Sequence, residues 1–155
     1  MNVNIRKMTE ADVPAVSALD QLSFSLPWPE RSFRFEVTSN NAARCWVTEV
    51  DGRIVGMIVG WLFVDEIHIA NVATHPDFRR QGIAQKMLTH ALRYTADEGA
   101  ITSFLEVRES NVSAQAMYRK FGYEITGRRK RYYKDNDEDA LLMTLEKINV
   151  EELEG

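Results

Sequence analysis

The sequence has few of the residues that form disulfides or bind metals. It contains one cysteine, Cys45, so no internal disulfide can form, which fits a reducing compartment. Cys45 lies in a strand-like run, and no local motif supplies a base, so a small buried hydrophobic residue is favoured over a nucleophile. The histidines, His68, His75 and His90, lack the spacing of metal ligands. We therefore expect no metal.

Long apolar runs and an excess of positive charge are also missing. The longest apolar run, residues 54–64, is too short to cross a bilayer, and the N-terminal MNVNIRKM has no signal-peptide core. The formal net charge of −4 argues against nonspecific nucleic-acid binding, although it allows a local basic patch. We expect a cytoplasmic monomer or weak dimer with no membrane or nucleic-acid partner.

The composition that remains is typical of one globular domain. The 155 residues are 45% hydrophobic and 27% charged, which is enough for a substantial core. No internal repeat, low-complexity run or linker interrupts them. We predict one domain over residues 1–148 and a frayed acidic tail over residues 149–155.

Hydrophobic periodicity and turn residues predict the order β-α-α-β-β-β-α-β-α-β-β. The strands are expected at Val3–Lys7, Ala43–Val50, 53–64, Glu66–Thr74, 101–107, 123–133 and 140–147. The helices are expected from a Thr9 cap to about Gln21, over Glu30–Thr38, from Gly82 to Gly99, and from Ser110-Asn111 to Gly122. Asp51-Gly52 and the acidic residues 135–138 would each turn a hairpin.

This order predicts a single α/β domain with a mixed, mostly antiparallel sheet and helices on both faces. Three strands in series over residues 43–74 imply an antiparallel meander. The strand, helix and strand that span residues 66–107 form a right-handed crossover, so the strands near Glu66 and Ile101 should be parallel.

The crossover helix begins in a loop that suits an anion. Apolar residues recur at helical spacing from Ile83, and the first turn of a helix has unpaired N–H groups and the positive end of the dipole. The small residues Gly82 and Ala84 would let a pyrophosphate approach that backbone. The lysine and hydroxyl of a P-loop are absent, so an ordinary strand-to-helix connection remains an equal alternative.

Two further residues are candidates for chemistry. Glu106 lies at the C-terminal edge of the expected parallel pair, where ligands of open α/β sheets tend to bind, and Tyr118 follows on the next predicted helix. Considered alone, Glu106 could be a structural carboxylate and Tyr118 a core tyrosine. Likewise, Phe24 and Trp28 of the proline-bracketed loop could fill the core or line a cleft, and we favour both.

Three motifs together resemble the GCN5-related N-acetyltransferases over nearly the whole chain. The motifs are Arg79-x-x-Gly82-x-Ala84, Leu105-Glu106-Val107-Arg108-x-Ser110-Asn111 and Ala116-Met117-Tyr118-x-x-Phe121-Gly122-Tyr123. Within that superfamily the chain looks most like the RimI type, the ribosomal-protein alanine N-terminal acetyltransferases. Three features resemble that type: the Leu26-Pro27-Trp28 loop, the Leu105-Glu106-Val107-Arg108 strand, and Arg129-x-x-Tyr132-Tyr133 followed by Asp139-Ala140-x-x-Met143. The chain departs from the family in Ala84, where many members have glycine, and in the longer basic run Arg128-Arg129-Lys130-Arg131.

The resemblance implies acetyl-CoA as co-substrate and a splayed parallel strand pair that holds it. By analogy, the backbone of Val72, Ala73 and Thr74 pairs with the pantetheine arm, and Asn111 also contacts the cofactor. The pyrophosphate would be bound by Arg79, Arg80, Gln81, Gly82, Ile83, Ala84 and Gln85.

The resemblance also implies the reaction and the acceptor. Glu106 would be the general base and Tyr118 the general acid, while a backbone N–H near residues 72–74 would meet the oxyanion. The acceptor would be the N-terminal α-amine of a protein such as ribosomal protein S18, held by Phe24, Leu26, Trp28, Tyr132 and Tyr133. A lysine or small-amine acetyltransferase, and a CoA-binding module without turnover, remain as alternatives.

Overall fold

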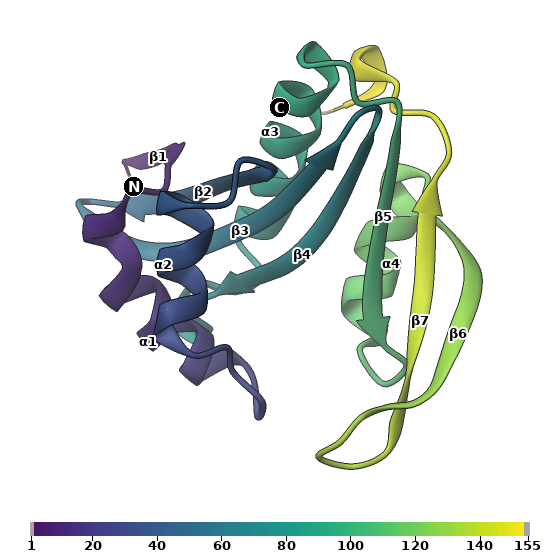
Figure 1. Ribbon diagram of the computed structural model, residues 1–155, viewed down its shortest axis with the longest axis horizontal. Helices are drawn as coiled ribbons and strands as arrows, with labels where there is room; N and C mark the ends of the chain where they lie inside the picture. The colour runs from purple at the N-terminus through teal and green to yellow at the C-terminus, as the bar shows by residue number, and fades with distance from the viewer. Residues whose placement is uncertain (1, 154–155) are drawn as a thin grey trace.

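A seven-stranded sheet runs through the computed structural model, which describes residues 2–153 (Figure 1). The strand order is β1-β2-β3-β4-β5-β7-β6, and neighbours are antiparallel except for β4 and β5. The strands are β1 Val3–Lys7, β2 Ala43–Val50, β3 Arg53–Phe63, β4 Glu66–Thr74, β5 Thr102–Arg108, β6 Glu124–Tyr133 and β7 Glu138–Leu145. The predicted mixed sheet with one parallel pair is confirmed.

Four α-helices cover the two faces of the sheet. They are α1 Val13–Ser23, α2 Glu30–Thr38, α3 Ile83–Asp97 and α4 Val112–Phe121. Met57 and Val59 of β3 belong to the core under α1 and α2, whereas Ile58 packs in the core under α3 and α4. The alternation of apolar residues in β3 therefore builds a core on each face, which is why this strand is apolar on both sides.

Local signals set several of these boundaries. Asp51 and Gly52 have φ of 50° and 83°, the left-handed pair that a tight hairpin between β2 and β3 requires. Cys45 in β2 is partly buried, and burial raises its pKa to about 12, in agreement with a packing role rather than a nucleophilic one.

The first predicted helix begins later than expected. Thr9 precedes a 3-10 turn over Glu10–Asp12, and α1 starts only at Val13. The Asp12 carboxylate accepts a hydrogen bond from the Thr9 N–H at 2.7 Å and pairs with Arg6 of β1. Thr9 is the N-cap of the 3-10 turn and forms a capping box with Asp12, and the turn runs directly into α1. Thr9 therefore caps the first helical segment, as predicted, although the α-helix itself begins one turn later.

The predicted frayed tail is wrong for the residues that the structure describes, 149–153. Asn149 accepts a hydrogen bond from the Glu151 N–H and starts a 3-10 turn over Val150–Glu152. Leu153 is buried in the core beside α3, and its carbonyl accepts a hydrogen bond from Arg93. An apolar anchor thus fixes the segment, while Glu154 and Gly155 lie outside the described residues.

The parallel strands stay paired for only a short distance. Glu66 to Ile69 of β4 pair with Thr102 to Leu105 of β5, and then the strands diverge (Figure 1). A bulge in the β3–β4 ladder falls at Ala70, directly after the last of these pairs. Bulges bend a strand, so this one turns β4 away from β5 and opens the sheet. No helix among residues 2–153 is long and apolar enough to cross a membrane.

We predict that Asp12→Asn destabilises the protein by about 2 kcal/mol at pH 7, because Arg6 loses a buried ionic partner. Hydrogen bonding to Arg6 lowers the pKa of Asp12, so its contribution is present at neutral pH and is lost as pH falls through the lowered value. Urea titrations should therefore show a gap between wild type and variant that narrows toward pH 3. An equal gap at both pH values would contradict this account.

Candidate active site

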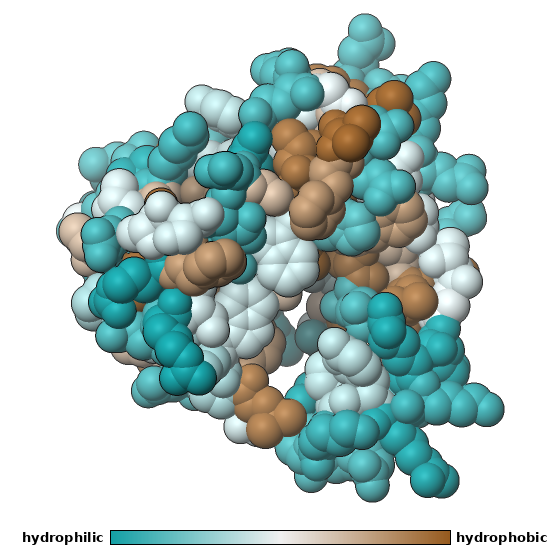
Figure 2. Space-filling model, in the orientation of Figure 1, coloured by the Kyte–Doolittle hydropathy of each residue, from teal (hydrophilic) through white to brown (hydrophobic). Residues whose placement is uncertain are grey.

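A cavity of about 520 Å³ lies where β4 and β5 separate, and we call it the central cavity. It connects through shared lining residues to a cavity of about 610 Å³ beside the start of α3, here the α3 cavity. On its other side it connects to a cavity of about 520 Å³ lined by aromatic side chains, here the aromatic cavity. Figure 2 shows the hollow between the two halves of the molecule. The opening therefore has access from both faces of the sheet.

The α3 cavity gathers nearly all residues predicted to hold the cofactor. Those lining it are Val72, Ala73, Thr74, Arg79, Arg80, Gly82, Ile83, Ala84, Gln85 and Asn111, whereas Gln81 does not line it. Beyond Ile69, β4 has no partner on the side of β5 within the described chain, so part of its backbone faces the opening. An extended pantetheine arm could pair with this edge.

The start of α3 has the geometry that an anion requires. Gly82 caps the helix with φ of 76°, and Arg80 before it has φ of 64°. The N–H groups of the first turn have no partner inside the helix, because the first helical bond runs from the Lys86 N–H to the Gly82 carbonyl. The buried Thr74 hydroxyl in the same cavity also has no partner in the described chain. These donors fit a pyrophosphate.

Asn111 has a structural role as well as a place in the site. Its side chain accepts a hydrogen bond from the Ala114 N–H at 3.2 Å and thereby caps α4. It lines both the central and the α3 cavity. The expected cap is confirmed, and contact of the same side chain with the cofactor stays a prediction.

Glu106 and Tyr118 line the central cavity from different elements. Glu106 lies near the C-terminal end of β5 with its side chain 33% exposed, and its Oε2 lies 3.2 Å from the Nε of Arg129. Tyr118 projects from α4 and is 8% exposed. Burial raises the pKa of its phenol to about 12, so the hydroxyl stays protonated at neutral pH. The cavity thus holds the accessible carboxylate of Glu106 and the protonated phenol of Tyr118.

The predicted acceptor-binding residues divide between two cavities. Tyr132 lines the aromatic cavity, Phe24 and Leu26 line the central cavity, and Trp28 and Tyr133 line both. Trp28 is half-buried and stacks on Phe33 and on Trp61. The dual role foreseen for this loop, partly core and partly cleft wall, agrees with these contacts.

Two site residues were missed in the sequence. Trp61 lines the aromatic cavity and is fixed by Glu36, which accepts from its indole N–H at 3.1 Å. Asp20 is fully buried and accepts from the Trp28 N–H at 2.7 Å and from Asn71 at 3.0 Å. Burial raises the pKa of Asp20. Asp20 belongs to no motif in the sequence. A carboxylate on the apolar face of a predicted helix could nevertheless have indicated a buried polar role.

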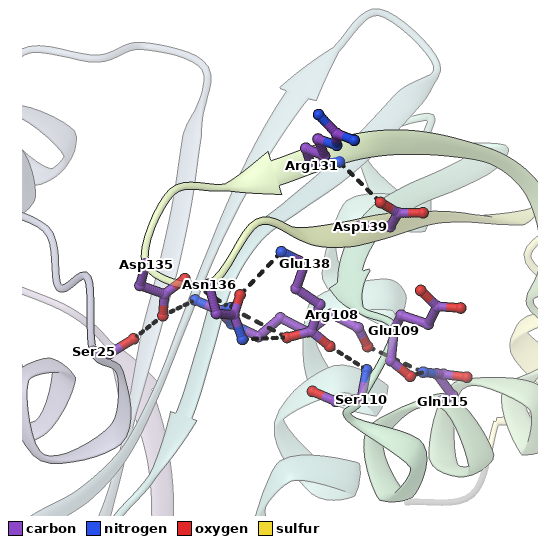
Figure 3. Close-up of polar contacts among 10 residues, drawn as sticks. All are labelled: Ser25, Arg108, Glu109, Ser110, Gln115, Arg131, Asp135, Asn136, Glu138 and Asp139. Carbon is purple, nitrogen blue, oxygen red and sulfur yellow. Dashed lines mark hydrogen bonds and ion pairs between the residues drawn. The ribbon is translucent and has the colours of Figure 1, made fainter.

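A polar clamp joins the two walls of the opening at its wide end. Ser25 of the α1–α2 loop hydrogen-bonds to Asp135 of the β6–β7 turn (Figure 3). Arg108 pairs with Asp135 at 3.0 Å and with Glu138 at 3.4 Å, and it lies 3.9 Å from the centroid of the Tyr133 ring. The hydrogen bond from Ser25 and the pairing with Arg108 lower the pKa of Asp135. These contacts, which we call the clamp (Ser25–Asp135–Arg108), connect the α1–α2 loop to the β6–β7 turn. The space between β4 and β5 is thereby enclosed by a ring of chain.

Comparison with known proteins identifies the family. The model described as the acetyltransferase (GNAT) family matches residues 13–123. The chain belongs to the GNAT family. The predicted resemblance is confirmed, and the protein is an acetyl-CoA-dependent N-acetyltransferase. No group of three or more potential metal ligands occurs among residues 2–153.

Similar proteins match almost over their full length. A Bacillus subtilis (strain 168) protein, provisionally named a ribosomal protein bS18-alanine N-acetyltransferase, is 37% identical over 90% of this chain and 92% of its own. The enzyme of that name from Escherichia coli (strain K12) is 31% identical over 91% and 95%. A crystal structure of the E. coli ribosomal-protein-S18-alanine N-acetyltransferase matches with a TM-score of 0.88 at 29% identity, over 96% and 95% of the chains.

We predict that Gly82→Ala weakens CoA binding about tenfold, because a Cβ there would project into the α3 cavity and the left-handed φ would be strained by about 1–2 kcal/mol. Gly99→Ala is the matched control, since Gly99 follows the other end of α3 with φ of 108° and equally open surroundings. Calorimetric titration with CoA should separate the two variants. Equal affinities would place the anion site elsewhere.

Proposed function

We propose that the enzyme acetylates the N-terminal α-amine of a protein, with ribosomal protein S18 as the favoured substrate. The observation that carries this proposal is the ring around the central cavity. The α3 cavity opens on one side of the ring, and the aromatic cavity opens on the other. With the clamp closing the wide end, an acceptor can reach Glu106 end-on from the aromatic cavity.

The identity of the protein substrate is supported by the relatives. Two of them carry the name of ribosomal protein bS18-alanine N-acetyltransferases and align over about nine-tenths of this chain. The aromatic cavity could hold the first residues of a flexible chain end, because its lining offers apolar faces beside the polar tips of tyrosines.

The α-amine makes modest demands on the base. Its reference pKa is about 7.7–8.0 against about 10.4 for lysine, so about a tenth or more of α-amines are neutral near pH 7. Glu106, directly or through one water, would accept the proton that the amine loses on attack. General base catalysis of this kind typically contributes a factor of roughly 10² to 10⁴. Acetyl-CoA supplies the activated acyl group when bound.

Tyr118 would assist the departing thiolate mainly as a hydrogen-bond donor. Its pKa of about 12 lies above the reference value of about 8.5 for a thiol, so complete proton transfer to a free thiolate is unfavourable. A donated hydrogen bond still stabilises charge that develops on sulfur in the transition state. Tyr118 lines both the central and the α3 cavity, where the thioester end of the cofactor would enter.

We predict that Glu106→Gln and Tyr118→Phe each lower kcat tenfold or more while CoA still binds. The purified enzyme and both variants would be incubated with acetyl-CoA and peptides that have free or blocked N-termini, and the products would be analysed by mass spectrometry. Acetylation of free α-amines by wild type supports the proposal. Transfer only to internal lysines or to polyamines would favour the other acetyltransferase alternatives, and unchanged rates in both variants would return these side chains to structural roles.

We further predict that Ser25→Ala raises the rate on an internal lysine, relative to a free α-amine, by about threefold or more, because the clamp loses a charge-assisted hydrogen bond. The opening would then admit a chain segment from the side. Asp139→Asn is the control. Asp139 pairs with Arg128 inside the hairpin, and its side chain is 22% exposed, close to the 23% of Asp135, the carboxylate that Ser25 contacts in the clamp. An unchanged ratio in Ser25→Ala, or an equal change in both variants, would show that the clamp does not control access.

A further inference from the structure

The charge of Glu106 is already paired within the chain. The Arg129 Nε lies 3.2 Å from its Oε2, although Arg129 belongs to β6 and β7 lies between β6 and β5. Arg129 is in register with Ala140 of β7, and Ala140 is in register with Arg108 of β5, two residues beyond Glu106. Strands lie about 4.8 Å apart, so the backbones of β6 and β5 are roughly 10 Å apart, and the side chains of Arg129 and Glu106 together bridge this distance across β7.

The place that the guanidinium occupies has the properties of an amine site. It lies beside a carboxylate and 5.7 Å from the centroid of the Tyr132 ring. Trp28, Tyr133, Arg129 and Glu106 all line the same aromatic cavity. A carboxylate together with aromatic faces is the environment that attracts an organic cation, whether guanidinium or ammonium.

The other arginines of this region point elsewhere. Arg128 pairs with Glu109 at 2.9 Å and with Asp139 at 2.7 Å, and Arg108 is held by the clamp. Among the described residues, Arg129 is the ion-pair partner of Glu106. Its side chain is 56% exposed and that of Glu106 is 33% exposed, so the pair is weak and can be broken by a competing cation.

We propose that Arg129 occupies the amine site of the free enzyme and is displaced by the ammonium group of the acceptor. The inference rests on the proposed function, because it assigns the amine site of that reaction. Arg129 is then a positioning residue that acts on binding through Glu106. Every ammonium ligand must break the ion pair between Arg129 and Glu106. This pair therefore lowers the affinity for a peptide N-terminus and for a small alkylammonium ion by the same factor.

Binding of two probes, n-butylammonium and a peptide with a free N-terminus, would be measured by NMR titration in the presence of CoA, so that no transfer occurs. Arg129→Gln should bind both probes tighter by a similar factor of roughly two- to fivefold, the range of an exposed ion pair. Arg129→Met provides a second uncharged variant that keeps a long aliphatic side chain. Arg129→Lys retains the positive charge and should bind the probes as wild type does.

Arg128→Gln is the matched control, since Arg128 is the adjacent ion-paired arginine of β6, 43% exposed, and should leave both affinities unchanged. Weaker or unchanged binding in both uncharged Arg129 variants would overturn the proposal, as would an equal gain in Arg129→Lys or in Arg128→Gln. A wild type that acetylates no α-amine would refute the proposed function, and the alkylammonium titration would still decide the role of Arg129.

Discussion

The loss of hydrogen bonding between β4 and β5 is the constraint on which the site depends. A sheet normally satisfies its backbone groups strand by strand, and here the parallel ladder stops after Ile69 and Leu105. The bulge at Ala70 turns β4 away, which leaves a backbone edge on one side of the opening and Glu106 on the other. The fold thus creates a place that an extended ligand can complete.

The two faces of the sheet supply different chemistry to this opening. α3 contributes unpaired N–H groups and the positive end of its dipole, which suit an anionic cofactor. The opposite cavity contributes aromatic rings and one carboxylate, which suit a cationic chain end. Tyr118 lines the central and the α3 cavity and Glu106 lines the central and the aromatic cavity, so the central cavity is where the two kinds of surface meet.

Local signals in the sequence predicted the parts of the site that local structure forms. Gly82, Asn111 and the Asp51-Gly52 turn lie where their cap and turn preferences placed them. The contributions of Asp20 and Trp61 could not be predicted, because they depend on which elements the packing brings together. The clamp unites residues 110 positions apart, and no spacing in the chain encodes that contact.

The same limit applies at the termini and in β6. Leu153 is fixed by a core built from residues far away in the sequence, so an acidic composition was a poor guide to its order. The pairing of Arg129 with Glu106 follows from the register of three strands, which the motif alone does not fix. Predictions from composition therefore failed where long-range packing determines the local structure.

The basic run of β6 has a consequence for self-association. β6 is an outer strand of the sheet, and its exposed backbone edge could pair with another copy of the chain. Arg128 to Arg131 place four cationic side chains in this strand, of which Arg128 and Arg129 form ion pairs within the chain, and the left-handed φ of 52° at Arg131 falls within a register irregularity. The broken ladder and the cations of this strand are features that disfavour pairing between such edges.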